Sequence, residues 1–388
     1  MNDVEVMLAL KGTSTFRHVE TDDFVISLRS FEGGIEHSAY IGCVSPAYTV
    51  LSAQKPISSG YYKFLLKSGP FIAALQSTTD SLRDGKAISY SNFGSLKLPL
   101  PPKKEQKQIA AFLDYETAKI DALIEKQQQL IALLGEKRQA VISHAVSKGL
   151  NPDAPMRDSG VEWLGEVPEH WNVTRLKFLV SQVADCHHST PHYDDDAQWP
   201  ALRTSDVFAG VLDVENARRI HTSEYLERIS RLKPETGDVI YAREGGRWGI
   251  AAPVPEGADV CLAQRVMLLR GNDRMMSQFV MWSLNSRPIY HQLDVNVVGS
   301  ASPHVNIGDV LEVWVAEPPI TEQPIIISRL EHQLSKLDSL DEQCVKVIDT
   351  LQERRTALIS AAVTGKIDVR GWQPPSADGQ LDSEMEVA

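Results

Sequence analysis

The chain repeats itself at an offset of 217 residues. Pro101–Gln106 (PPKKEQ) opens a long helical pattern that runs to about Lys148, and Pro318–Gln323 (PPITEQ) opens a second that runs to about Lys366. The register holds without a gap and pairs Ile109 with Ile326, Leu113 with Leu330, Ile120 with Leu337, Asp121 with Asp338, Leu123 with Leu340, Leu134 with Leu351, and Arg138 with Arg355. An ungapped register of this length indicates an internal duplication.

Both long segments have the apolar spacing of paired helices. Each begins at Pro, where a missing N–H costs nothing, and the apolar steps then alternate between four and three residues, as in a coiled coil. Neither helix can bury its stripe alone, so we expect the two to pack on each other; the alternative is two independent helices on separate cores. The seam we expect contains Ile109, Leu113, Ile120, Leu123 and Leu134 of the first helix, and Ile326, Leu330, Leu337, Leu340 and Leu351 of the second.

A mixed, strand-rich segment precedes each helix. Phe24–Leu28, Val44–Leu51 and Asp238–Ala242 have the apolar, β-branched character of strands, and the first of these matches the third across the duplication. About 70 residues precede the match at Thr236, whereas about 20 precede the match at Thr21. We therefore expect the first globular domain to be truncated at its N-terminus.

The predicted fold class is α+β, with two mixed α/β domains separated by two long helices. The expected boundaries are 1–104 for the first domain, 105–148 for the first helix, 149–162 for a linker, 163–318 for the second domain, 319–366 for the second helix, and 367–388 for a tail. This tail carries Asp and Glu with no Lys or Arg after Arg370, so we expect it to be disordered.

Composition limits the setting in which the chain works. No apolar run approaches the roughly 18 residues of a membrane span, and the first residues lack the basic region of a signal peptide. The four cysteines are scattered, which favours the reducing cytoplasm over a disulfide framework. The net charge of −12 argues mildly against nucleic acid as a partner.

No catalytic or nucleotide-binding signature is present. The sequence lacks a phosphate loop ending in Lys-Ser/Thr, a G-x-G-x-x-G after a strand, and a Ser/His/Asp or Cys/His set in a catalytic context. Asp185–Tyr193 (DCHHSTPHY) holds one Cys and three His, but adjacent ligands do not follow zinc spacing, so no metal site is predicted. As a polar loop this segment could present donors to phosphates or base edges, or it could cap the core as a simple turn.

Two further stretches have side chains suited to bases. Arg243 and Arg247 flank a Gly-rich turn after a strand, and Gln264-Arg265 follows a second strand. Arg fits guanine O6 and N7, and Gln fits adenine N6 and N7. Taken singly, each of these residues reads as an ordinary surface residue.

Several phrases together resemble the specificity subunits of type I restriction-modification systems, the HsdS family. Two of these motifs are duplicated: the Pro-Pro-x-x-Glu-Gln helix start, and the segment Arg138–Ser143 with its counterpart Arg355–Ser360. The segment Asp158–Trp171 resembles the one that opens a target-recognition domain in that family. The other matching segments are Asp185–Pro191, Arg203–Val207 and Leu262–Arg265. The resemblance covers nearly the whole chain. The departure from the family pattern is the truncated first target-recognition domain.

The resemblance implies a non-catalytic, cytoplasmic subunit with an antiparallel coiled coil and a pseudo-twofold axis. Each target-recognition domain would read one half of a bipartite, asymmetric site in double-stranded DNA. The helices would space the halves and dock two methyltransferase (modification) subunits, and restriction endonuclease/translocase subunits would join them. No cofactor is implied for the chain itself, because S-adenosylmethionine and ATP would belong to the partner subunits.

The candidate DNA-binding residues under this reading lie mainly in the second domain. They are His188, Ser189, Thr190, Arg203, Thr204, Ser205, Arg243, Arg247, Gln264 and Arg265 there, and Arg29, Ser45 and Tyr48 in the first domain. The alternative is a coiled-coil scaffold that docks methyltransferase subunits but reads only one half-site or none.

Overall fold

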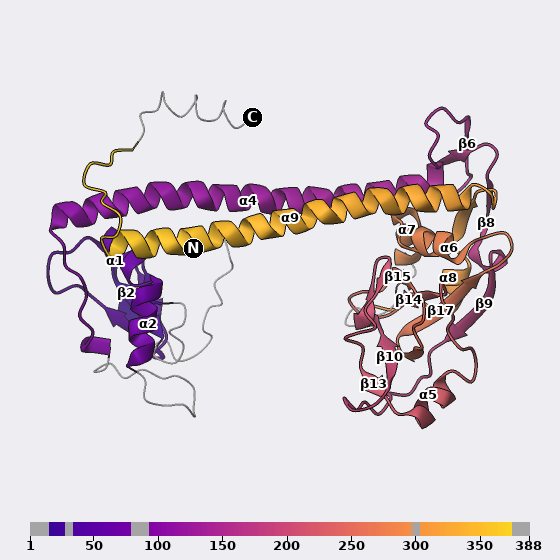
Figure 1. The fold of residues 1–388 in the computed structure, drawn as a ribbon, viewed down its shortest axis with the longest axis horizontal. Helices are drawn as coiled ribbons and strands as arrows, with labels where there is room; N and C mark the ends of the chain where they lie inside the picture. Colours follow the sequence, from indigo (N-terminus) through magenta and orange to yellow (C-terminus); the bar gives the residue numbers. More distant parts are fainter. Residues whose placement is uncertain (1–14, 28–33, 79–92, 296, 298–302, 375–388) are drawn as a thin grey trace. The chain divides into compact units, whose positions relative to one another are not determined.

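The computed structural model of the chain describes residues 15–27, 34–78, 93–295, 297 and 303–374. The chain forms two compact units: unit 1 comprises Met1–Leu130 and Gln343–Ala388, and unit 2 comprises Ile131–Glu342. The division passes through both long helices, α4 (Lys103–Lys148) and α9 (Gln323–Val363) (Figure 1). It differs from the expected domain boundaries because each globular part packs against a segment of both helices.

Unit 1 is built from short strands and two short helices on the long-helix segments. Its elements are β1 (Arg17–Val19), β2 (Phe24–Ser27), β3 (Glu36–His37), β4 (Gly42–Val44), β5 (Tyr48–Leu51), α1 (Ser59–Leu65) and α2 (Gly69–Ser77). The antiparallel sheet has the order β3-β2-β5, and β1 pairs with β4. The single strand expected over Val44–Leu51 is interrupted at Pro46, which has no N–H to give to a sheet.

Unit 2 holds two larger sheets. The first has the antiparallel order β15 (Ile250–Pro253), β14 (Val239–Ala242), β17 (Val266–Gly271) and β9 (Val180–Asp185). The second has the order β13 (Arg219–Ile220), β10 (Trp199–Arg203) and β16 (Cys261–Gln264), with β10 parallel to β16. Strand β14 is buried along its whole length, which explains its run of apolar residues.

Shorter elements complete unit 2. They are β6 (Met156–Asp158), β7 (Glu166–Pro168), β8 (Asn172–Arg175), η2 (Leu176–Phe178), η3 (Thr204–Asp206), β11 (Val207–Phe208), β12 (Val211–Leu212), α5 (Thr222–Arg228), α6 (Ser277–Leu284), α7 (Arg287–Asp294), α8 (Ile307–Leu311) and β18 (Trp314–Glu317). The core of the two sheets is made of aliphatic side chains such as Leu202, Ile240 and Leu268, each at 0% exposure.

The repeated Gln of the Pro-Pro-x-x-Glu-Gln motif makes the same contacts in both units. In unit 1 the Gln106 amide donates to the Pro101 carbonyl (2.8 Å) and accepts from the Ser58 backbone N–H (2.8 Å). In unit 2 Gln323 donates to Pro318 (3.0 Å) and accepts from the Met276 N–H (2.8 Å). Both Gln side chains are buried, so the motif fastens the start of a long helix to the start of a short one.

A second repeated contact links the long helices within each unit. In unit 1 the Arg355 guanidinium of α9 pairs with the Asp121 carboxylate of α4 at 2.8 Å. In unit 2 Arg138 of α4 pairs with Asp338 of α9. These pairs join equivalent positions in the 217-residue register of the sequence.

Two residues of the expected seam are exposed, which corrects their assignment to the interior. Seven of its ten residues are buried, namely Ile109, Leu113, Ile120, Leu134, Ile326, Leu330 and Leu337, and Leu351 is half-buried. Leu123 and Leu340 are instead 47% and 46% exposed. On α4 the stripe passes through the buried Thr117 and then the half-buried Ile124, one residue after Leu123. A polar residue can occupy this stripe because the Thr117 hydroxyl donates to the Leu113 carbonyl at 2.6 Å.

The expectation of a disordered tail is wrong for residues 367–374. Val369 is 3% exposed, and the Trp372 ring packs against Phe112 and Tyr115 of α4 with centroid distances of 5.5 and 5.6 Å. Residues 375–388 lie outside the described part of the chain. In the described part, no helix is both long and apolar enough to cross a membrane.

Candidate nucleic-acid interface

Four of the stretches singled out in the sequence come together at one end of the sheets of unit 2. They follow the C-terminal ends of β9, β10, β14 and β16. The Gln264 amide donates to the Thr190 hydroxyl (2.7 Å), and the Thr204 hydroxyl donates to the Arg265 carbonyl (3.2 Å). They meet because β9 and β14 are both antiparallel to β17, and β10 is parallel to β16.

Arg243 lies beneath this surface and does not face solvent. It is 6% exposed, and its guanidinium pairs with the Asp185 carboxylate at 2.9 Å. Its backbone N–H donates to the Arg265 carbonyl (3.1 Å), and its own carbonyl accepts from Val305 (2.9 Å). A guanidinium held in this way cannot reach a base edge while the ion pair stands, so the predicted direct contact of Arg243 with DNA does not fit the geometry.

Arg265 is the candidate that presents its side chain outward. It sits between β16 and β17 with a φ of 63°, a left-handed conformation that lets the chain leave one sheet and enter the other. Its side chain is 56% exposed, and its Nε lies 3.5 Å from the Glu244 carboxylate. This carboxylate is itself 3.7 Å from Arg243, so it lies between a buried and an exposed guanidinium.

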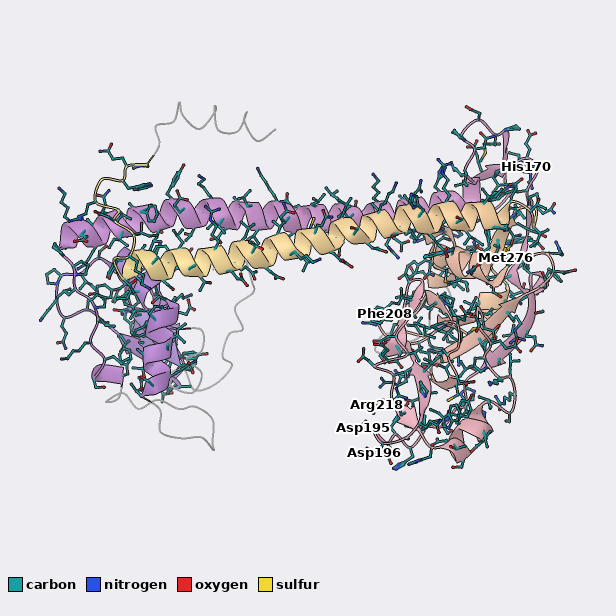
Figure 2. All side chains as sticks on the ribbon, viewed as in Figure 1. His170, Asp195, Asp196, Phe208, Arg218 and Met276 are labelled. Carbon is teal, nitrogen blue, oxygen red and sulfur yellow. The ribbon has the colours of Figure 1, made fainter. Side chains whose placement is uncertain are left out.

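Arg247 and His188 are also exposed. The Arg247 guanidinium lies 4.3 Å from the centre of the Phe208 ring, and its Nη1 donates to the Ser205 carbonyl at 2.9 Å. Phe208 is 42% exposed and lies at the edge of unit 2 (Figure 2). His188 is 81% exposed, 3.5 Å from the Asp185 carboxylate. The surface thus combines cations with an exposed aromatic ring, which suits phosphates and stacked bases.

Arg203 is tied to its own turn. It donates to the buried Asp206 carboxylate at 3.0 and 3.3 Å, and the Ser205 hydroxyl donates to the same group at 2.8 Å. The Arg203 and Arg218 guanidinium groups lie 5.8 and 5.1 Å from the Tyr193 ring. Burial raises the pKa of the Tyr193 hydroxyl, so the ring stays neutral between these cations.

Sequence reasoning missed Phe208, Arg218, Arg228 and Glu244. Figure 2 shows Arg218 at the end of unit 2 that lies away from the long helices, together with two acidic residues, Asp195 and Asp196. Arg228 is buried, and it donates to the carbonyl and hydroxyl of Ser189 at 3.1 and 3.2 Å. A signal for Arg228 was present, since Glu224 precedes it by one helical turn.

Cys186 of the His-rich loop points into the core. It is 3% exposed, and burial raises the pKa of its thiol, which disfavours the thiolate that a metal would need. Burial also raises the pKa of the Cys261 thiol, to about 12. Within the residues that the structure describes, no group of three or more His, Cys, Asp or Glu has the arrangement of a metal site.

The candidates in unit 1 are less informative. Arg29 lies outside the described residues. Ser45 lies in the turn between β4 and β5, where its carbonyl accepts from the Tyr48 N–H at 3.1 Å, and the Tyr48 side chain is 43% exposed. Tyr48 of β5 pairs with Ser27 of β2, and Val266 of β17 pairs with Ala242 of β14 in the same way. Tyr48 therefore begins the strand that corresponds to β17.

Comparisons with known proteins agree on one family. Residues 49–133 match the family model described as the type I restriction modification DNA specificity domain. The chain is 25% identical over 285 residues to the type I restriction enzyme MjaVIII specificity subunit of Methanocaldococcus jannaschii, covering 72% of this chain and 64% of that protein. It is 23% identical over 338 residues to the EcoKI specificity subunit of Escherichia coli, covering 85% of this chain and 70% of that protein.

The fold also has a solved counterpart. A chain from a structure that explains complex assembly and conformational transition of the type I R-M system superposes with a TM-score of 0.68. The identity is 14%, and the match covers 90% of this chain and 84% of that one. The protein is therefore similar in sequence to proteins of the DNA-specificity class. The relatives that it matches are specificity subunits of type I restriction-modification systems, and its fold is similar to that of a chain from such a system.

Proposed function

We propose that the chain is a non-catalytic DNA-recognition subunit of a type I restriction-modification complex, and that unit 2 reads one half of a bipartite site. The observation that carries the proposal is the convergence of four strand ends on one surface of unit 2. Three of these strand ends bring exposed or half-exposed side chains that suit DNA, including Thr190, Arg247, Gln264 and Arg265. Base contacts from several loops on a rigid sheet are what sequence reading requires.

Gln264 and Arg265 are the residues we assign to base edges. The Gln264 amide is bonded only to the Thr190 hydroxyl in the described contacts, and an adenine edge offers the same kind of donor and acceptor. Arg265 reaches outward from a backbone that is bonded to Arg243 and Thr204. Its guanidinium can leave the half-buried Glu244 carboxylate for guanine O6 and N7, since a partly exposed ion pair is weak.

Arg243 has a positioning role in this account. By pairing with Asp185 it fixes the start of the loop that carries His188, Ser189 and Thr190. Arg203 and Ser205 hold their turn together by bonding to Asp206, and Thr204 ties this turn to the Arg265 carbonyl. We assign Arg247 and His188 to phosphate contacts. The net charge of −12 does not oppose this, because phosphate affinity depends on the local cations of the contact surface.

The long helices act as an antiparallel coiled-coil spacer with pseudo-twofold symmetry. The repeated Gln106 and Gln323 contacts and the two Arg–Asp pairs support this arrangement. Leu123 and Leu340, exposed at equivalent positions of the register, suit the docking of two methyltransferase subunits. Restriction endonuclease/translocase subunits complete the complex, and the partners carry S-adenosylmethionine and ATP.

Selection from a library of DNA duplexes with two randomised blocks tests the proposal. The full chain, co-purified with methyltransferase subunits, should enrich a defined motif. Gln264→Ala and Arg265→Ala should each relax the preference at one or two positions by about 1–3 kcal/mol. Lys177→Ala is the matched control, because Lys177 pairs with Glu312 beyond the opposite end of β9. A parent complex that enriches no motif would favour the scaffold alternative.

A further inference from the structure

Arg228 is a buried arginine without a surface role. It is the last residue of α5, its side chain is 2% exposed, and its guanidinium donates hydrogen bonds to other groups of the protein. Nη2 donates to the carbonyl and the hydroxyl of Ser189, and Nη1 donates to the Ala263 carbonyl at 3.2 Å. Burying a guanidinium is costly unless it is paired and bonded, so this arrangement serves the segments that it joins.

Glu224 supplies the matching charge from the preceding turn of α5. Its carboxylate accepts from Arg228 Nη2 at 3.2 Å and from the His192 backbone N–H at 3.1 and 3.3 Å. The two side chains therefore hold both ends of the loop 189–192. The helix itself is fixed by Tyr225, whose ring stacks on Trp199 with centroids 4.2 Å apart and planes 10° apart.

The segments held by Arg228 carry two of the residues that we assign to DNA. Ser189 precedes Thr190, and Ala263 precedes Gln264. At the surface the same two segments are joined by the Gln264–Thr190 hydrogen bond. That surface bond must be exchanged when Gln264 turns to a base, whereas the Arg228 bonds below it remain. The loop then keeps its place relative to β16 at the moment of reading.

We propose that the Glu224–Arg228 pair is a clamp that positions the loop 189–192 against the end of β16 and so sets the base preference at the positions read by Thr190 and Gln264. The inference rests on the proposed function of unit 2. Neither side chain touches DNA in this account; both are positioning residues. If the clamp acts in this way, losing the Glu224–Arg228 contact relaxes the base preference at a few positions of the DNA site. The number of phosphates that the protein contacts stays the same.

The test uses the full chain in its complex, with Glu224→Gln and Arg228→Lys as clamp variants. Arg231→Met is the control, since Arg231 is an exposed arginine three residues beyond Arg228. Duplex selection gives the base preference at each position, the salt dependence of affinity counts phosphate contacts, and amide hydrogen exchange of the free chain reports on His192. Thermal unfolding checks that each variant is folded.

Both clamp variants should lose preference by about tenfold at one or two positions, the effect of about one mismatch. The salt slope should stay unchanged, and His192 exchange should quicken by about tenfold or more, since each tenfold step corresponds to about one lost hydrogen bond. Arg231→Met should match the parent in every readout. If Arg228→Lys fails to fold, Glu224→Gln decides, because it keeps the shape of the side chain while removing its charge and one of its two acceptor oxygens.

Two outcomes would overturn the inference, and they are distinguishable. A parent complex that enriches no motif overturns the proposed function and the clamp with it. A parent complex that enriches a motif which folded Glu224→Gln and Arg228→Lys variants retain at every position overturns the clamp alone.

Discussion

Replacing Arg243 by Met would remove the cation that neutralises Asp185 beneath the candidate interface. The two groups are 2.9 Å apart, and their side chains are 8% and 18% exposed. Breaking a buried ion pair costs about 3–5 kcal/mol, because one charge stays behind without a partner. Asp185 keeps some contact with water, so we expect a cost near the lower limit, about 3 kcal/mol.

For a unit of about 200 residues, this cost corresponds to a fall of roughly 6–12 °C in the Tm of unit 2. Differential scanning calorimetry of the full chain measures it. Arg265→Met is the matched control: its guanidinium is 56% exposed, so the Tm should stay within about 2 °C of the parent value. Adding Asp185→Asn to Arg243→Met should recover part of the loss, because the stranded carboxylate is then neutral.

Two results would refute this reasoning about the site. A Tm of Arg243→Met equal to that of the parent would mean that the ion pair does not hold the loop. An equal fall in Tm for Arg265→Met would mean that burial does not distinguish Arg243, the positioning residue, from Arg265, the residue assigned to DNA.

Two further predictions concern the rest of the chain. Leu337→Asp should destabilise unit 2 by about 3 kcal/mol or more, because Leu337 is 9% exposed. Leu340→Asp should leave the Tm unchanged and weaken co-purification of methyltransferase subunits. Equal falls in Tm for the two variants would contradict the assignment of Leu337 to the interior and Leu340 to the surface. In unit 1, burial raises the pKa of Tyr61 from 10.0 to about 12, and its hydroxyl donates to the Val363 carbonyl at 3.0 Å. The folded state therefore favours the neutral phenol, and this stability is fully present below pH 10 and lost as pH rises toward 12. Urea unfolding against pH should show this loss in the parent and a smaller one in Tyr61→Phe; identical profiles would contradict it.

The 217-residue register is the sequence feature that most helps to explain the contacts between the long helices. The register that pairs Asp121 with Asp338 and Arg138 with Arg355 is realised as two reciprocal ion pairs between α4 and α9. It also accounts for the repeated Gln, whose amide closes the same pair of hydrogen bonds in each unit. The two Gln side chains are buried, so each copy of the motif must satisfy the same amide donor and acceptor.

Burial along the long helices could not be predicted fully from the spacing of apolar residues. The apolar spacing predicts that Leu123 and Leu340 are buried, yet both side chains are about half exposed. On α4 the adjacent Ile124 is half-buried, and the buried Thr117 lies on the same stripe. Whether a threonine can be buried depends on a hydrogen bond to a carbonyl four residues earlier, and hydrophobic periodicity does not register that bond.

The site was predicted as stretches of sequence but not as an arrangement. Arg243, Arg247 and Arg265 have the same chemistry in the sequence, and only the fold makes the first buried and the others exposed. Arg228 was not among the candidates named from the sequence. Its burial depends on where β16 and the loop 189–192 meet, which is a tertiary fact that local spacing does not contain.

Solving the structure of the complex with the selected duplex would show which face of unit 2 reads DNA. We expect the ends of β9, β10, β14 and β16 to face one major groove, with Gln264 and Arg265 within hydrogen-bond distance of base edges and Arg243 still paired with Asp185. A duplex bound on another face of unit 2, or held by phosphate contacts alone, would contradict it.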